Sequence, residues 1–161
     1  MSANLIPPPP VTPLAKDHIV ATLESSTAFG AIEELVAQLV AAGSIVPDAK
    51  GAVGTALEER ERSMSTGIGC GVAIPHASTP DVSAPTLAFG RSKTGIDFNA
   101  LDQQPVRLVM LVLVPAGQRE KHLPTIARIS RLFHRGEIRA ALESAGDADA
   151  IQRVLEENLP A

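Results

Sequence analysis

The sequence predicts a single α/β domain, on three observations. Its 161 residues are the size of one domain and are enough to bury a core. Hydrophobic residues make up 45% and charged residues 20%, which is the composition of an ordinary globular protein. Segments with the two-residue period of strands alternate along the chain with segments that have the helical period, and this alternation is typical of α/β domains.

The clearest helix is predicted between residues 26 and 43. Ser26 or Thr27 can cap its start, and Gly43 is a typical helix end. The apolar residues between them recur at helical spacing: Ile32, Leu35, Val36, Leu39 and Val40. One face of this helix is therefore expected to be apolar.

A second helix is predicted from Pro47 or Asp48 to about Arg62. Its buried stripe consists of Val53, Ala56 and Leu57. Arg60 extends this stripe, and two interpretations of that arginine stay open. Its stem could cover the core while the guanidinium reaches solvent, or the guanidinium could bind an anion at the edge of the fold, beside His76.

The predicted strands differ in how strongly the pattern marks them. Residues 107–114 form a continuous run of mostly branched apolar side chains, which is typical of a central strand buried on both faces. Residues 18–23 alternate weakly, and residues 87–91 are expected to form a short strand. Polar turns and loops are expected at residues 77–85 and 94–99.

Residues 65–76 are predicted to form a strand of small and apolar residues. Three glycines fall on one face of this strand at its two-residue period: Gly67, Gly69 and Gly71. Glycine weakens a strand, so we expect another backbone or a partner to approach closely there. Pro75 ends the pairing because it has no N–H group to donate. His76 is therefore expected at a rigid strand end.

A third helix is predicted from about Lys121 to Phe133, with His122 at or beside its N-terminus. Four residues lie on one stripe of this helix: His122, Ile126, Ile129 and Phe133. Residues 119–139 hold six basic side chains against two acidic ones. Such a segment is either a solvated helix face or a surface for an anion or an acidic partner, and the sequence leaves both interpretations open.

Composition argues against several classes of function. The net charge of −4, without Trp or Tyr, argues against nucleic-acid binding. Cys70 is the only cysteine, so no internal disulfide can form. The Pro-rich residues 1–16 are expected to be a flexible lead and carry no secretory signal. The longest apolar run, residues 108–114, is too short to cross a bilayer, and we expect a cytoplasmic protein without membrane insertion.

Three roles are open for His76 from the residues alone. It could be a nucleophile that accepts a phosphoryl group, with one ring nitrogen bare and the other held by a backbone carbonyl. Arg60 and the start of the His122 helix would then supply the donors to the phosphate. It could instead bind zinc with His122, although the third ligand, Asp81 or Glu120, is unconvincing. Otherwise it is a structural histidine.

The chain resembles the enzyme IIA domain of the fructose/mannitol type, from the bacterial phosphoenolpyruvate-dependent sugar phosphotransferase system. The resemblance covers roughly residues 17–157. It is carried by Glu59-Arg60-Glu61, Ser65-Thr66-Gly67-Ile68-Gly69, Gly71-Val72-Ala73-Ile74-Pro75-His76-Ala77, Gly95-Ile96-Asp97-Phe98, Asp102, Pro105-Val106, Leu113-Val114-Pro115 and His122-Leu123. It implies one domain over residues 17–161, with a mixed β-sheet flanked by α-helices on both faces.

The resemblance also implies a site and a role. His76 would accept a phosphoryl group from an HPr-like phosphocarrier protein, Arg60 would clamp the phosphate, and His122 would support it. No cofactor and no metal would be required. The chain looks most like the nitrogen-regulatory branch, whose members bind a regulated target protein according to their phosphorylation state. The alternatives are a sugar-specific IIA subunit that passes phosphate to a IIB domain for sugar uptake, and a non-catalytic regulatory binding protein whose partner binding depends on phosphorylation state.

Overall fold

The computed structural model describes residues 14–159, so residues 1–13 of the predicted Pro-rich lead lie outside the described part. The helices in this part are α1 (Ala28–Ala41), α2 (Lys50–Ser63), α3 (Arg119–Phe133), α4 (Gly136–Ser144) and α5 (Ala148–Asn158), with short 3₁₀ turns η1 (Lys16–His18) and η2 (Pro47–Ala49). The strands are β1 (Ile19–Val20), β2 (Gly67–Gly69), β3 (Val72–Ala73), β4 (His76–Thr79), β5 (Thr86–Ile96) and β6 (Val106–Pro115). None of these helices is long and apolar enough to span a membrane.

The described strands form one mixed sheet in the order β1-β5-β6-β3-β2, and β4 pairs with β6 as well. β1 is parallel to β5, and β5 is antiparallel to β6. Both β3 and β4 run parallel to β6, at successive positions along the same side of it. β4 is therefore an edge strand beside the C-terminal half of β6.

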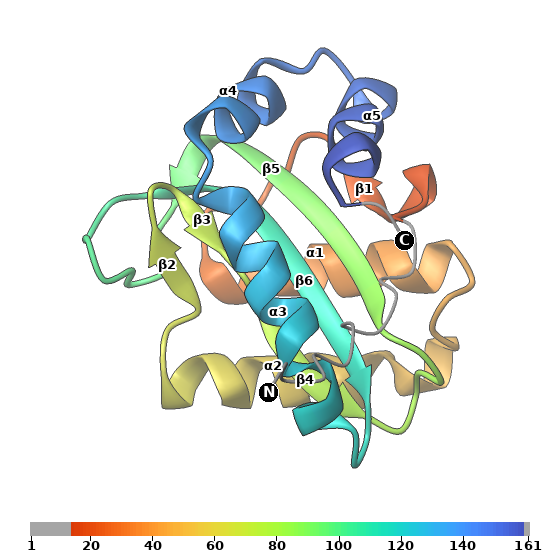
Figure 1. Ribbon diagram of the computed structural model, residues 1–161. Helices are drawn as coiled ribbons and strands as arrows, with labels where there is room; N and C mark the ends of the chain where they lie inside the picture. Colours follow the sequence, from red (N-terminus) through yellow and green to blue (C-terminus); the bar gives the residue numbers. More distant parts are fainter. Residues whose placement is uncertain (1–13, 160–161) are drawn as a thin grey trace, which may run out of the picture.

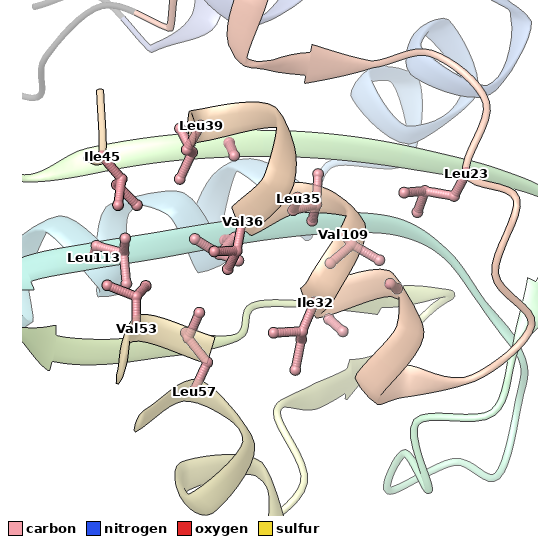
Figure 2. Close-up of a cluster of buried hydrophobic side chains, with 14 of the residues drawn as sticks. Leu23, Ile32, Leu35, Val36, Leu39, Ile45, Val53, Leu57, Val109 and Leu113 are labelled. Atoms are coloured by element: carbon pink, nitrogen blue, oxygen red, sulfur yellow. The ribbon is translucent and has the colours of Figure 1, made fainter. Parts of the chain in front are cut away.

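Helices cover both faces of this sheet, as predicted. In Figure 1, α3 crosses in front of β6, whereas α1 and α2 lie behind the sheet. Residues of β6 alternate between the two sides: Val109 and Leu113 pack with α1 and α2, and Met110 and Val112 pack with α3, α4 and α5. Figure 2 shows the first of these clusters, with Val109 and Leu113 against side chains of α1 and α2.

The predicted helices have the expected N-terminal cap in α1 and bury most residues of their predicted apolar stripes in the core. Thr27 caps α1, where its side-chain oxygen accepts a hydrogen bond from Gly30 N at 3.0 Å. Four of the five predicted stripe residues of α1 are fully buried: Ile32, Leu35, Val36 and Leu39. In α3, His122, Ile129 and Phe133 are buried, and the helix begins two residues earlier than predicted.

The prediction of one continuous glycine-rich strand was wrong. Residues 67–73 form an antiparallel hairpin of β2 and β3, because Gly69, Cys70 and Gly71 have positive φ angles of 94°, 57° and 77°. The expected close approach comes from within the chain. A Cβ atom on Gly67 would lie 2.7 Å from Cβ of Ala100.

Two loop predictions were also wrong in part. Residues 76–79 form β4, although their composition is polar, because an edge strand exposes one side to water. β5 extends from residue 86 to residue 96 and is longer than the predicted strand at 87–91. It also takes in part of the predicted loop at 94–99. The register with β6 shifts between Arg91 and Ile96, and this irregularity contains the exposed Lys93 and Thr94, of which Thr94 belongs to the predicted turn.

Candidate functional site

His76 is the first residue of β4, so the expectation that it ends a strand was wrong. The chain bends at Pro75 just before it, and the backbone groups around this bend have separate partners. Ile74 N donates to Thr66 O at 3.0 Å, and Pro75 O accepts from Val112 N at 2.9 Å. The carbonyl oxygen of Ile74 accepts a hydrogen bond from the His76 ring at Nδ1, at 2.8 Å. The bend at Pro75 thus supplies the carbonyl that holds the imidazole.

This contact defines the tautomer of His76. A carbonyl oxygen can only accept, so Nδ1 must carry the proton and Nε2 keeps its lone pair. Nε2 makes no hydrogen bond with any other residue between 14 and 159. A half-buried imidazole with one nitrogen held and the other bare is the arrangement that a histidine nucleophile requires.

The His76 ring lines an open cavity of about 380 Å³. The walls come from both layers of the fold, because β4 is an edge strand with α2 toward one face and α3 toward the other. The lining residues are Ala56, Glu59, Arg60, His76, Ala77, Ser78, Val114, Arg119 and Ile126. The structure therefore brings together the predicted pair of His76 and Arg60.

The cavity keeps His76 neutral near pH 7. Burial lowers the pKa of its imidazole, because removal from water penalises the charged form. The positive charges of Arg60 and Arg119 lower this pKa further, while the hydrogen bond to Ile74 O acts in the opposite direction. The net result is a pKa below the ordinary value for histidine, so the nucleophilic form dominates.

Arg60 is half-buried near the C-terminal end of α2. Its Nη1 donates to Met64 O at 2.9 Å, which ties the guanidinium to the residue that caps this helix. A guanidinium has five N–H donors, so this bond leaves donors for a ligand in the cavity. Of the two interpretations of Arg60, the structure favours a guanidinium at the edge of the fold beside His76.

His122 does not line the cavity. Its side chain is buried, with 3% of its surface exposed. Nε2 donates to Gln118 Oε1 at 3.2 Å, and Nδ1 has no partner among the described residues. Burial, followed by the charge of Lys121, lowers the pKa of this imidazole. The predicted third member of the site is therefore buried in the first turn of α3, between Arg119 and Ile126, which do line the cavity.

The structure adds one cation that the sequence pattern did not single out. Arg119 is exposed at the start of α3 and lines the cavity with His76. Sequence reasoning placed it only within the basic segment 119–139. Arginines elsewhere in that segment have other roles: Arg135 pairs with Glu137 at 2.8 Å, and Arg139 donates to Phe133 O at 2.8 Å.

The zinc interpretation has no support in the described part of the chain. No group of three or more His, Cys, Asp or Glu side chains there is arranged to hold a metal ion.

Comparison with known proteins identifies the family. Residues 12–158 match the family described as "Phosphoenolpyruvate-dependent sugar phosphotransferase system, EIIA 2". The "PTS system fructose-specific EIIA component" of Haloferax volcanii is 43% identical over 132 residues, which cover 82% of this chain and 84% of that protein. A "Nitrogen regulatory protein" of Bradyrhizobium diazoefficiens is 37% identical over 147 residues, which cover 91% and 94%.

A solved structure agrees with these matches. The nitrogen regulatory protein IIA-Ntr from Neisseria meningitidis is 31% identical, with a TM-score of 0.79 over 89% of this chain and 96% of that chain. The matches in sequence and in fold cover nearly the whole described domain. The chain therefore belongs to the EIIA type 2 family of the phosphoenolpyruvate-dependent sugar phosphotransferase system.

Proposed function

We propose that this protein is a phosphocarrier that accepts a phosphoryl group on His76 from an HPr-like phosphohistidine protein. The observation that carries the proposal is the 2.8 Å contact between His76 Nδ1 and the Ile74 carbonyl, on the wall of a cavity that also holds Arg60. A histidine held in this way keeps Nε2 as the nucleophile. Membership of the EIIA type 2 family supports the proposal independently.

The transfer is a direct exchange between two imidazole rings. The Nε2 lone pair of His76 attacks the phosphorus of the donor phosphohistidine, and a new N–P bond forms. The P–N bond of the donor breaks, and its electron pair goes to the donor ring nitrogen. The donor ring keeps the proton on its other nitrogen and leaves as neutral imidazole. His76 then carries the positive ring charge, which Ile74 O stabilises through the Nδ1–H hydrogen bond.

Arg60 and His122 have different roles in this proposal. Arg60 binds the phosphoryl oxygens through the guanidinium N–H groups that do not donate to Met64 O. His122 acts indirectly, because it is buried and is not one of the residues that line the cavity. Its bond to Gln118, the residue that caps α3, holds the first turn of that helix beside His76.

We further propose a regulatory role of the nitrogen-regulatory type, in which the phosphorylation state controls binding to a target protein. The full-length matches to nitrogen regulatory proteins, at 94% and 96% of their chains, support this role. The alternative is a fructose-type IIA subunit that feeds a IIB domain, which the 43% identity to the Haloferax protein favours. Transfer of label from this protein to an added fructose IIB domain would select the alternative.

The test of the phosphocarrier proposal is a reconstituted transfer. The full chain is incubated with phosphoenolpyruvate, enzyme I and an HPr-like carrier, and the label is mapped by mass spectrometry at neutral pH. We expect an acid-labile label on His76 that His76→Ala abolishes. His134→Ala is the matched control, since His134 is exposed and lies outside the cavity, and it should label normally.

Label that persists in His76→Ala would overturn the assignment of the site. Absence of label from the wild-type protein would overturn the phosphocarrier proposal as a whole. Circular dichroism of His76→Ala distinguishes loss of the nucleophile from loss of the fold.

A further inference from the structure

Arg119 has a position in the fold that no established role explains. It is the first residue of α3, its side chain is exposed, and it lines the same cavity as His76. Its guanidinium makes no hydrogen bond or ion pair with any residue between 14 and 159. Arg60 reaches the cavity from α2, in the opposite layer of the fold. The two arginines therefore reach the same cavity from helices on different sides of the sheet.

We propose that Arg119 is a second phosphate-binding residue, whose guanidinium holds the phosphoryl group on His76 from the side opposite Arg60. This inference rests on the proposed phosphocarrier function. It assigns to Arg119 the direct contact that the sequence led us to expect near His122, which is buried three residues further along the same helix.

The charges of the cavity support a second cation. Glu59 lines the cavity beside Arg60, and together these two side chains have no net charge. A phosphoryl group carries up to two negative charges, so this pair alone would leave it uncompensated. Arg119 makes the lining net positive. Ser78 is the remaining polar side chain in the lining and adds a hydroxyl donor without charge.

The electrostatics of His76 agree with the position of Arg119 in the cavity lining. After burial, the charges of Arg60 and Arg119 are the causes that lower the His76 pKa. A positive charge that disfavours the imidazolium form of His76 also favours an anion bound to the same ring. No other described basic residue has this effect on His76.

The test compares Arg119→Gln, Arg119→Lys and Arg131→Gln. Arg131 is the matched control, because it is an exposed arginine on the same helix and lies outside the cavity. Phosphoramidate serves as a small phosphoryl donor, so that partner docking does not affect the result. We expect Arg119→Gln to slow labelling of His76, or to speed loss of the phosphoryl group, by about tenfold, the effect of one hydrogen bond to a charged group.

Arg119→Lys should recover only part of this loss, because lysine cannot make the bidentate contact. An NMR titration of the unphosphorylated protein should show a higher His76 pKa in Arg119→Gln and no change in Arg131→Gln. A merely structural role of Arg119 would leave that pKa unchanged.

The outcomes separate this inference from the function on which it rests. Wild-type protein that labels on His76, together with an Arg119→Gln variant that labels and hydrolyses at the wild-type rate, overturns the role of Arg119 alone. An equal effect of Arg131→Gln would show that the effect comes from general surface charge, and would also overturn the proposed role of Arg119. Wild-type protein without label on His76 overturns the proposed function, and the inference with it.

Discussion

At the scale of single residues, the proposed reactivity of His76 depends on one backbone carbonyl. Ile74 O holds Nδ1, so Nε2 is the nitrogen that can attack, and burial keeps the ring neutral. These two effects are independent of any partner. A free histidine would divide its population between two tautomers and an imidazolium form near its pKa of about 6.5. The cavity selects one of these three forms.

Acceptance of phosphate should therefore fall only at acidic pH. The His76 pKa lies below the ordinary histidine pKa of about 6.5. We therefore expect the labelling rate to stay constant from about pH 7.5 down to about pH 6.5, and to decline as the pH drops through the lowered pKa. Arg60→Gln removes one cause of the lowering, so its decline should begin at higher pH. Phosphoramidate labelling between about pH 5 and 8 measures both curves. Curves that decline at the same pH would contradict the influence of Arg60.

Arg60→Lys tests the clamp without a change of charge. We expect transfer to slow by about tenfold, because lysine loses the fork geometry that a phosphoryl group accepts. Arg62→Lys, two residues along α2 and outside the cavity, makes the same chemical change and should transfer normally. Rapid-quench transfer from the HPr-like donor gives the rates. If both variants match the wild type, Arg60 is a surface residue.

His122 is expected to act through the first turn of α3. His122→Ala removes the bond to Gln118 and should slow transfer by about tenfold, yet leave His76 as the labelled residue. His122→Gln keeps an N–H donor and should recover part of the rate. Transfer kinetics of the two variants measure the difference. Alanine and glutamine variants with the same rate would make His122 a packing residue.

At the scale of elements, a buried carboxylate joins α2 to the glycine hairpin. Glu61 accepts two hydrogen bonds from Thr66, from N at 3.0 Å and from Oγ1 at 2.5 Å, and both side chains are buried. This pair holds the end of α2, with Arg60 on it, against the strand that leads to His76.

Glu61→Gln should destabilise the fold, because the amide NH₂ group can only donate to Thr66 Oγ1. The charge-assisted bond from this hydroxyl is lost, and its buried proton has no acceptor on residue 61. We expect a loss of about 1–3 kcal/mol in the free energy of unfolding. Urea denaturation followed by circular dichroism measures it. Glu59→Gln, an exposed change on the same helix, is the control and should stay within about 0.5 kcal/mol of the wild type. Equal midpoints for the two variants would contradict this account.

The helices and β6 could be predicted because burial imposes a period on their sequences. Ile32 and Leu35 recur on one face of α1, and residues 108–114 are apolar because both faces of β6 are covered. The hairpin at residues 67–73 could not be predicted from period. Glycines at a two-residue spacing fit a strand equally well, and only the positive φ angles reverse the chain.

The candidate site, like the fold, could be predicted only in part from the sequence. The position of His76 after Pro75 led to the expected backbone carbonyl, and the stripe of α2 led to Arg60 at the cavity. Arg119 left no signal, because an exposed arginine at a helix start among other basic residues has no pattern of its own. The burial of His122 followed from its stripe, but its separation from the cavity depends on how α3 packs on the sheet.

At the scale of the whole molecule, the site exists only because two layers meet at a sheet edge. Figure 1 shows α2 and α3 on opposite faces of the sheet, and Arg60 of α2, Arg119 of α3 and His76 of β4 line one cavity. β4 pairs with β6 on one side, and in the described part of the chain no further strand covers its other side. Under the proposed function, the phosphohistidine of a donor protein would approach His76 at this edge.

The central claim is that Nε2 of His76 is the atom that receives the phosphoryl group. Nitrogen-15 NMR of the histidine rings in the phosphorylated protein tests it most directly, because phosphorylation shifts the resonance of the nitrogen that is bonded to phosphorus. The account predicts one N–P bond, at Nε2 of His76, with the proton still on Nδ1 beside the Ile74 carbonyl. A phosphoryl group on Nδ1 of His76, or on any other histidine, would contradict it.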